Sequence, residues 1–396
     1  MDFAAFEQHA VFRHEVAAWL DRELTEALRQ EFERDTVFLR VPREWSPAVR
    51  DFNRRLGARG WIGLHWPREY GGGGRSLREQ LSVVEELAAR HARIINSQAL
   101  HAVQTLLVHG TEEQKREVIP RVTAGEIEIA LGYTEPEAGS DLANVQMRAF
   151  EDGDAYVITG QKIFNTMAHW ASYHWLLART DPAAEPKHRG LTMFLVDLGT
   201  PGITVQPLYT MDDSRTNIVY YDRVRVPKSA VVGKPGGGFY VAMEALDKER
   251  LFVFNPHFYR SLLDELTEYT KATARDGGLL SRDPLVRERL ARLDVELAVA
   301  DVLYQRVIWL VEQEQSAAVA SAMLKMFITE LGQHLVGVAQ EVVGQVGLLR
   351  AGSTRAVLRG LIELGQRATI FHTFGAGGNE LMRSIIAIRG YGLPAA

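Results

Sequence analysis

The chain has 396 residues, of which 46% are hydrophobic and 24% charged, and it contains no cysteine. This composition is typical of a globular protein with a large core, and the missing thiols exclude disulfides, thiolate nucleophiles and cysteine-ligated metals. The net charge of −5, with no basic stripe, argues against a nucleic-acid partner. A phosphate-bearing ligand would therefore be held locally, by backbone amides and a few cations.

The first segment, residues 1–127, has the spacing of amphipathic helices. Apolar side chains recur at helical intervals at Val11, Phe12, Val16, Trp19 and Leu20. Acidic residues among them argue against a signal peptide, and no apolar run approaches the ~18 residues of a membrane span. Glycines predict a loop over residues 60–74, and Thr111 with Gln114 has the form of a capping box that opens a helix. We expect a cytoplasmic protein without a membrane span.

The second segment, residues 128–235, is predicted to be a β domain. Short runs of alternating apolar residues, each bounded by Gly, Asp, Pro or Asn, occur at residues 155–158, 175–178, 191–196 and 218–221. Such runs are typical of antiparallel strands joined by turns.

The third segment, residues 236–396, returns to the helical period. Leu, Val and Ala repeat at steps of three and four residues, which predicts a helix-bundle domain. The sequence therefore predicts an α+β protein of three domains, in the order helical, β and helical.

Motifs in these segments resemble those of the acyl-CoA dehydrogenase family. Residues 131–141, LGYTEPEAGSD, resemble its TEPxAGSD signature, and residues 160–166, GQKIFNT, resemble its GxKxW/FIT strand. Residues 221–227, YDRVRVP, and residues 377–387, GGNELMRSIIA, resemble two further family segments. The motifs occur in family order across nearly the whole chain, so they count as joint evidence.

The resemblance implies a fold and a cofactor. The fold would be an N-terminal helical domain, a central antiparallel β-barrel and a C-terminal four-helix bundle, and the cofactor would be FAD. A flavin needs backbone donors at its polar edge and apolar contact on its face. The implied cofactor-binding residues are Leu131, Tyr133, Thr134, Gly139, Ser140, Phe164, Asn165, Thr166, Glu341, Gly344, Gly378 and Glu380.

Several of these residues have an expected role. Tyr133 and Thr134 would offer a backbone N–H and a hydroxyl to the pyrimidine edge of the flavin. Phe164 would pack near the dimethylbenzene side and Thr166 would bond near N5. Gly139 and Ser140 would form a loop that phosphate or thioester groups can approach closely; on its own, Phe164 would more often be a core aromatic.

The catalytic base is not at its most common family position. Dehydrogenation of an acyl thioester needs a carboxylate to remove the α proton, and many relatives carry a Glu where this chain has Ala376. A subset resembling isovaleryl-CoA dehydrogenase carries the base on the first helix of the C-terminal domain, a position that Glu249 matches. We therefore expect Glu249 to be the base, with Arg250 neutralising or orienting charge beside it. A Glu beside an Arg is otherwise usually a solvated helix pair.

The substrate would be an acyl-CoA. Ser140, Asp247, Arg250 and Ala376 are the implied substrate contacts, and Ala376 would donate its backbone N–H to the thioester oxygen. The resemblance also implies an electron-transfer flavoprotein as electron acceptor and a role in lipid metabolism. No histidine or carboxylate cluster has ligand spacing, so no metal site is expected.

Two departures from the family bear on assembly. The Arg-x-x-Phe-Gly segment, which in relatives reaches the FAD of a neighbouring subunit, is absent, and Arg275 is the only cation near its place. The usual Gln-x-x-Gly-Gly stretch begins with Glu341. Bacterial relatives acting on sterol side chains pair two unlike subunits, so both homo- and hetero-oligomers, as dimers or tetramers, stay open.

Three functions remain open on sequence grounds. The first is dehydrogenation of an acyl-CoA. The second is a non-catalytic subunit that supplies half of a composite site, which Ala376 and the missing phosphate contacts motivate. The third is a flavin monooxygenase or reductase on the same scaffold.

Overall fold

The computed structural model describes residues 9–394, apart from the side chains of Thr36 and of residues 247–250. Contacts divide the chain into two compact units that interleave along the sequence. The helical unit contains residues up to 40, residues 81–93 and residues from 250 onward, and the sheet unit contains residues 41–80 and 94–249. The predicted division into three consecutive domains stays a prediction.

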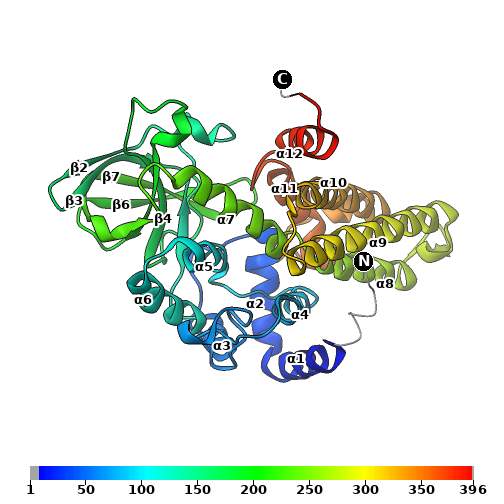
Figure 1. The fold of residues 1–396 in the computed structure, drawn as a ribbon. Helices are drawn as coiled ribbons and strands as arrows, with labels where there is room; N and C mark the ends of the chain where they lie inside the picture. Colours follow the sequence, from blue (N-terminus) through cyan, green and yellow to red (C-terminus); the bar gives the residue numbers. More distant parts are fainter. Residues whose placement is uncertain (1–8, 395–396) are drawn as a thin grey trace. The chain divides into compact units, whose positions relative to one another are not determined.

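The sheet unit is built on eight strands. Figure 1 labels β2, β3, β4, β6 and β7 in this sheet. They are β1 (Ile129–Gly132), β2 (Arg148–Asp152), β3 (Ala155–Lys162), β4 (Tyr173–Arg179), β5 (Leu191–Asp197), β6 (Ile203–Tyr209), β7 (Arg215–Pro227) and β8 (Val231–Val232). The four apolar runs predicted as strands lie in β3, β4, β5 and β7, which confirms them. Every residue of β4 is buried, as its nearly continuous apolar sequence favours.

The expected α+β fold, with a sheet between helical segments, is confirmed, but the sheet differs from the expected antiparallel barrel in two respects. The strand order is β6-β7-β3-β2-β4-β5-β8, with β1 pairing with β4, so the sheet is open. The reason lies at its ends, because β8 has only two residues and offers too few backbone groups to close against the seven-residue β6. The sheet is also mixed, because β1 and β2 run parallel to β4.

Helices of the sheet unit precede the sheet in sequence. They are α3 (Pro47–Ala58), α5 (Ser97–His109) and α6 (Glu112–Thr123). The predicted capping box at the start of α6 is confirmed, because the Thr111 hydroxyl accepts from the Gln114 N–H at 3.2 Å and the Gln114 side chain accepts from the Thr111 N–H at 3.0 Å.

The helical unit contains the bundle expected from the third segment. Its helices are α1 (Ala10–Glu23), α2 (Glu26–Thr36), α8 (His257–Ala272), α9 (Pro284–Glu312), α10 (Ala318–Val343), α11 (Leu361–His372) and α12 (Asn379–Ile385). Helix α10 packs against α8, α9, α11 and α12, and Figure 1 shows α8, α9 and α10 running beside one another. Its sequence is apolar around most of its circumference, so it forms the centre of the bundle.

Two helices run from one unit into the other, α4 (Leu77–Ala88) and α7 (Gly238–Val253). Two short strands, β9 (Ala274–Arg275) and β10 (Gly278–Leu279), and a 3-10 turn (Leu280–Arg282) connect α8 to α9. Among the helices of residues 9–394, none is both long and apolar enough to cross a bilayer.

Candidate active site

Two motif segments about thirty residues apart in sequence lie side by side at the ends of β1 and β3. The Ile163 N–H donates to the Thr134 carbonyl at 2.9 Å, and the Asn165 side-chain amide donates to the Leu131 carbonyl at 3.0 Å. The Lys162 ammonium donates to the Tyr133 carbonyl at 2.9 Å. These bonds join residues 131–134 to residues 162–165, and we call the pair of segments the motif cradle.

The outer side of the motif cradle is open. Phe164 is 55% exposed, and Thr134 and Thr166 are half-buried. Gly139 and Ser140, further along the signature loop, are exposed, and a Cβ added at Gly139 would meet no atom within 4 Å. A flat aromatic side chain beside accessible backbone fits the face and edge of a planar cofactor such as a flavin.

The inner side of the motif cradle is closed. Tyr133 is 8% exposed and Asn165 is 1% exposed, so both side chains belong to the closed side. Asn165 and Asn217 bond each other twice, because the Asn165 N–H donates to the Asn217 carbonyl and the Asn217 side-chain amide donates to the Asn165 carbonyl, both at 2.9 Å. The Leu131 N–H is also used, by the Gln98 side chain at 3.3 Å, which leaves the Leu131 side chain for any ligand contact.

Phe164 owes its exposure to its backbone. Its φ of 60° is in the left-handed region, which costs a residue with a Cβ roughly 1–2 kcal/mol. The Thr166 N–H donates to the Phe164 carbonyl at 2.9 Å and closes the turn that follows β3. This strained turn directs the aromatic ring outward. Without the turn, a Phe directly after β3 would be expected in the core.

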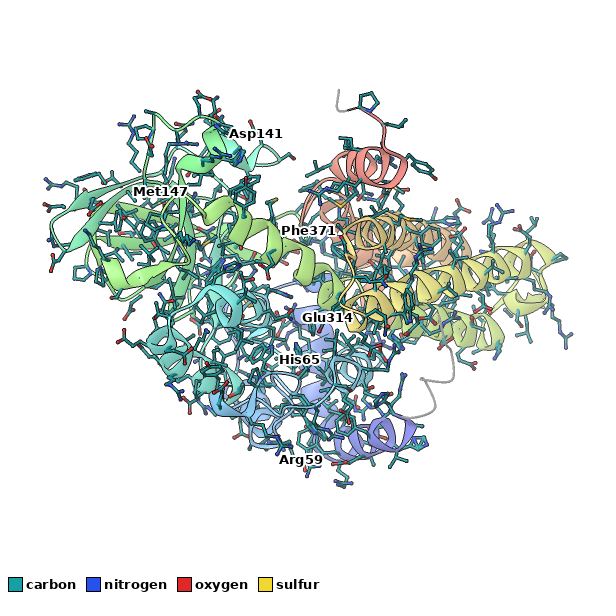
Figure 2. The ribbon with its side chains drawn as sticks, viewed as in Figure 1. Arg59, His65, Asp141, Met147, Glu314 and Phe371 are labelled. Atoms are coloured by element: carbon teal, nitrogen blue, oxygen red, sulfur yellow. The ribbon has the colours of Figure 1, made fainter. Side chains whose placement is uncertain are left out.

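A buried ion pair lies beneath the motif cradle, and sequence analysis missed it. Lys162 is fully buried and contacts Glu135, which is 6% exposed, at 2.8 Å. Glu135 also accepts from the main-chain N–H of Gln146 at 2.7 Å and of Met147 at 2.9 Å. In Figure 2, Met147 and Asp141, the last residue of the signature loop, are labelled in the sheet unit. A lysine at the end of the largely buried strand β3 was the available signal.

Burial changes the acid–base behaviour of this region. Desolvation lowers the pKa of Lys162 to about 8, and the attraction of Glu135 offsets only part of that effect. His174, fully buried in β4, bonds the Tyr221 hydroxyl through Nδ1 at 2.9 Å. Desolvation, aided by the charge of Lys162, lowers the pKa of His174 to about 3, so this histidine is neutral near pH 7.

The candidate residues of the helical unit fall into two groups. Glu341 lies near the end of α10 and pairs with Arg289 at 2.5 Å, beside a pocket of about 340 Å³. Gly344 caps α10 with a φ of 79°. Gly378 and Glu380 open α12. Asn379 bonds Glu330 at 3.1 Å, and Glu341 is eleven residues further along α10, a rise of roughly 16 Å, so the two groups are separate.

Ala376 lies in the turn between α11 and α12, with a φ of 53°. Lys325, fully buried in α10, donates to the Thr373 carbonyl at 3.1 Å and to the Asn379 side chain at 2.8 Å. These two acceptors are near the two ends of the turn, so one ammonium holds it closed. Sequence analysis did not single out Lys325.

The expected base is only partly described. Glu249, Asp247 and Arg250 belong by their backbone to α7, and their side chains lie outside the described residues. Helix α7 ends at Val253 and α8 begins directly after Pro256, as expected for a proline that interrupts a helix.

One group of possible metal ligands occurs among the described residues, Glu33, His91 and Glu265. Arg359 contacts Glu33 at 2.7 Å and Glu265 at 2.6 Å, and His91 bonds Glu265 at 2.9 Å. Because the guanidinium already compensates both carboxylates, we interpret this group as an ion-pair network of the helical unit.

Comparisons with known proteins match most of the chain. The models of the acyl-CoA dehydrogenase N-terminal, middle and C-terminal domains match residues 7–126, 130–224 and 236–391. The acyl-CoA dehydrogenase FadE26 of Mycobacterium tuberculosis is 38% identical over 357 residues, which cover 86% of this chain and 87% of the relative.

Solved structures agree. The ChsE4-ChsE5 complex from Mycobacterium tuberculosis matches with a TM-score of 0.88 and 33% identity, over 98% of each chain. The Tcur3481-Tcur3483 steroid ACAD matches with a TM-score of 0.89 and 32% identity, over 100% of this chain and 99% of that one. The chain therefore belongs to the acyl-CoA dehydrogenase family of oxidoreductases.

Proposed function

We propose that this protein catalyses the FAD-dependent α,β-dehydrogenation of an acyl-CoA thioester. The observation that carries the proposal is the motif cradle, where Tyr133 and Thr134 are bonded to residues 162–165 with the Phe164 ring exposed beside them. We assign Leu131, Tyr133, Thr134, Phe164, Asn165 and Thr166 to the isoalloxazine ring, and Gly139 and Ser140 to groups that approach the loop. Glu341 with Gly344, and separately Gly378 with Glu380, are assigned to other parts of the cofactor.

The chain's own residues would perform the proton chemistry. Glu249 takes the α proton, and the electron pair left on the α carbon forms the new double bond as the β hydrogen leaves. FAD, when bound, supplies the hydride acceptor. The Ala376 N–H donates to the thioester oxygen, which stabilises the charge that develops there. Arg250 and Asp247 orient Glu249 and the substrate.

We further propose a hetero-oligomer and a steroid-derived acyl group. Two similar structures are the ChsE4-ChsE5 complex and the Tcur3481-Tcur3483 steroid ACAD, each of two components. The absent Arg-x-x-Phe-Gly segment agrees with a phosphate contact supplied by an unlike subunit. Electrons would pass to an electron-transfer flavoprotein.

A panel of acyl-CoA esters, including one with a steroid acyl group, tests the reaction. The purified protein should carry oxidised flavin, and a productive ester should bleach it anaerobically. Glu249→Gln should lose bleaching while retaining ester binding. Glu244→Gln is the matched control, because Glu244 lies on the same helix and bonds His109 at 2.8 Å. Bleaching by Glu249→Gln at the wild-type rate would remove Glu249 from the mechanism.

The non-catalytic subunit is the second candidate, because Ala376 occupies the most common base position. A non-catalytic subunit would be a colourless protein that binds no flavin by itself, and adding an acyl-CoA ester would not change this. Flavin bound to the isolated chain and bleached by an ester would contradict it.

A further inference from the structure

The buried Lys162–Glu135 pair calls for an explanation other than stability. Removing two charges from water costs several kcal/mol per ion, and a buried pair often contributes no net stability. The pair nevertheless lies in a fully closed part of the sheet unit, at the end of β3, where Lys162 faces Val219 of β7 across the ladder. The hydrogen-bond partners of the Lys162 ammonium indicate its role.

Lys162 bonds one carbonyl of the motif cradle directly, that of Tyr133 at 2.9 Å. In a planar trans peptide the C=O and the following N–H point to opposite sides. Because the Tyr133 carbonyl is directed inward to the ammonium, the Thr134 N–H is directed outward. Outside the regular helices and strands of residues 9–394, no main-chain hydrogen bond uses the Thr134 N–H.

The ammonium is itself held firmly. The Glu135 carboxylate accepts from the main-chain N–H groups of Gln146 and Met147, the two residues that directly precede β2. The other titratable groups that face this region are His174 of β4 and Tyr221 of β7, which bond each other. Burial keeps His174 neutral and raises the pKa of Tyr221, so near neutral pH Lys162 and Glu135 carry the only charges of this set of four residues.

We propose that Lys162 is a positioning residue, whose charge orients the Tyr133–Thr134 peptide so that the Thr134 N–H faces the flavin. This inference rests on the proposed function. Glu135 favours the charged state of Lys162, so both residues act on the cofactor without touching it.

The proposal predicts a pH dependence of FAD affinity. Below pH 8 Lys162 is charged and holds the carbonyl, and above it the amine is neutral and its hydrogen bond is weaker. Titration of the apoprotein with FAD, followed by quenching of flavin fluorescence, should therefore show affinity falling as pH rises through about 8.

Three variants distinguish positioning from a structural role. Lys162→Met should weaken FAD binding about tenfold at neutral pH and remove the pH transition. Glu135→Gln removes the favourable charge, so the transition should move to lower pH. Lys228→Met is the matched control, since this half-exposed lysine of the same unit pairs with Glu151 at the surface, and it should leave the wild-type affinity and pH profile unchanged.

The outcomes separate the two proposals. Wild-type apoprotein that binds no FAD at any pH overturns the proposed function and this inference with it. Wild-type binding that Lys162→Met and Glu135→Gln leave unchanged in strength and pH profile overturns the inference alone. If Lys162→Met does not fold, the direction in which Glu135→Gln moves the transition decides.

Discussion

Asn165 donates its side-chain amide to the main-chain carbonyl of Leu131 at 3.0 Å, which ties the turn after β3 to the end of β1. The bond joins residues 34 positions apart and holds together two segments that the proposed flavin needs at once. Since Asn165 is 1% exposed, solvent cannot replace the bond.

Asn165→Ala should lower the free energy of unfolding by about 1–3 kcal/mol, because it leaves the Leu131 carbonyl without its donor. Urea unfolding of the apoprotein measures the loss. The control is Asn144→Ala, since the half-buried Asn144 makes only an exposed side-chain bond with Gln146, and its cost should be below about 0.5 kcal/mol. Equal losses in the two variants would contradict the importance of the Leu131 bond.

The lowered pKa of Lys162 predicts that stability rises with pH, whereas FAD affinity is predicted to fall. Its native pKa is about 8 and its ordinary value is 10.5, so between these values the unfolded chain binds the proton and the native chain does not. The free energy of unfolding of the wild type, relative to Lys162→Met, should therefore rise with pH over this range, by about 3 kcal/mol in total.

This rise contrasts with the FAD affinity, which should fall over the first part of the same range. Parallel urea series at matched pH give the difference between wild type and variant. A difference that stays flat or decreases as pH rises would show that the native charge of Lys162 costs no stability.

The Gln114 side chain should contribute more to stability than the N-terminal cap of α6 alone. Its side-chain amide also donates to the carbonyls of Ser229 at 2.8 Å and Val231 at 3.1 Å, which fastens α6 to the start of β8. Thr111→Ala should cost about 1 kcal/mol for the lost cap, and Gln114→Ala about 2–3 kcal/mol. Thermal or urea unfolding of both variants checks the order, and a larger loss for Thr111→Ala would contradict it.

Position 132 requires a glycine, because the His174 imidazole leaves no room for a Cβ there. A Cβ at position 132 would lie 2.3 Å from His174 Nε2, and the imidazole is fully buried between β1 and β7. Gly132→Ala should therefore cost about 1–3 kcal/mol. His174→Ala removes the obstacle, so the double variant should be more stable than the sum of the single losses predicts; strict additivity in this double-mutant cycle would rule out the clash.

Local patterns made much of this protein predictable. The strands within β3, β4, β5 and β7, the capping box at Thr111 and the helical first and third segments follow from periodicity and turn chemistry, which act over a few residues. The motif residues of β1 and β3 could likewise be listed in advance as a family resemblance.

The sequence by itself determined the order of helical and β segments, because backbone preferences and apolar spacing are local. Only the tertiary structure decided that the sheet stays open, since closure depends on whether β6 and β8 meet, and that Lys162 is enclosed with Glu135 beneath the Tyr133 carbonyl. Desolvation and pairing of charges depend on everything packed around them, and that environment comes from residues distant in the chain.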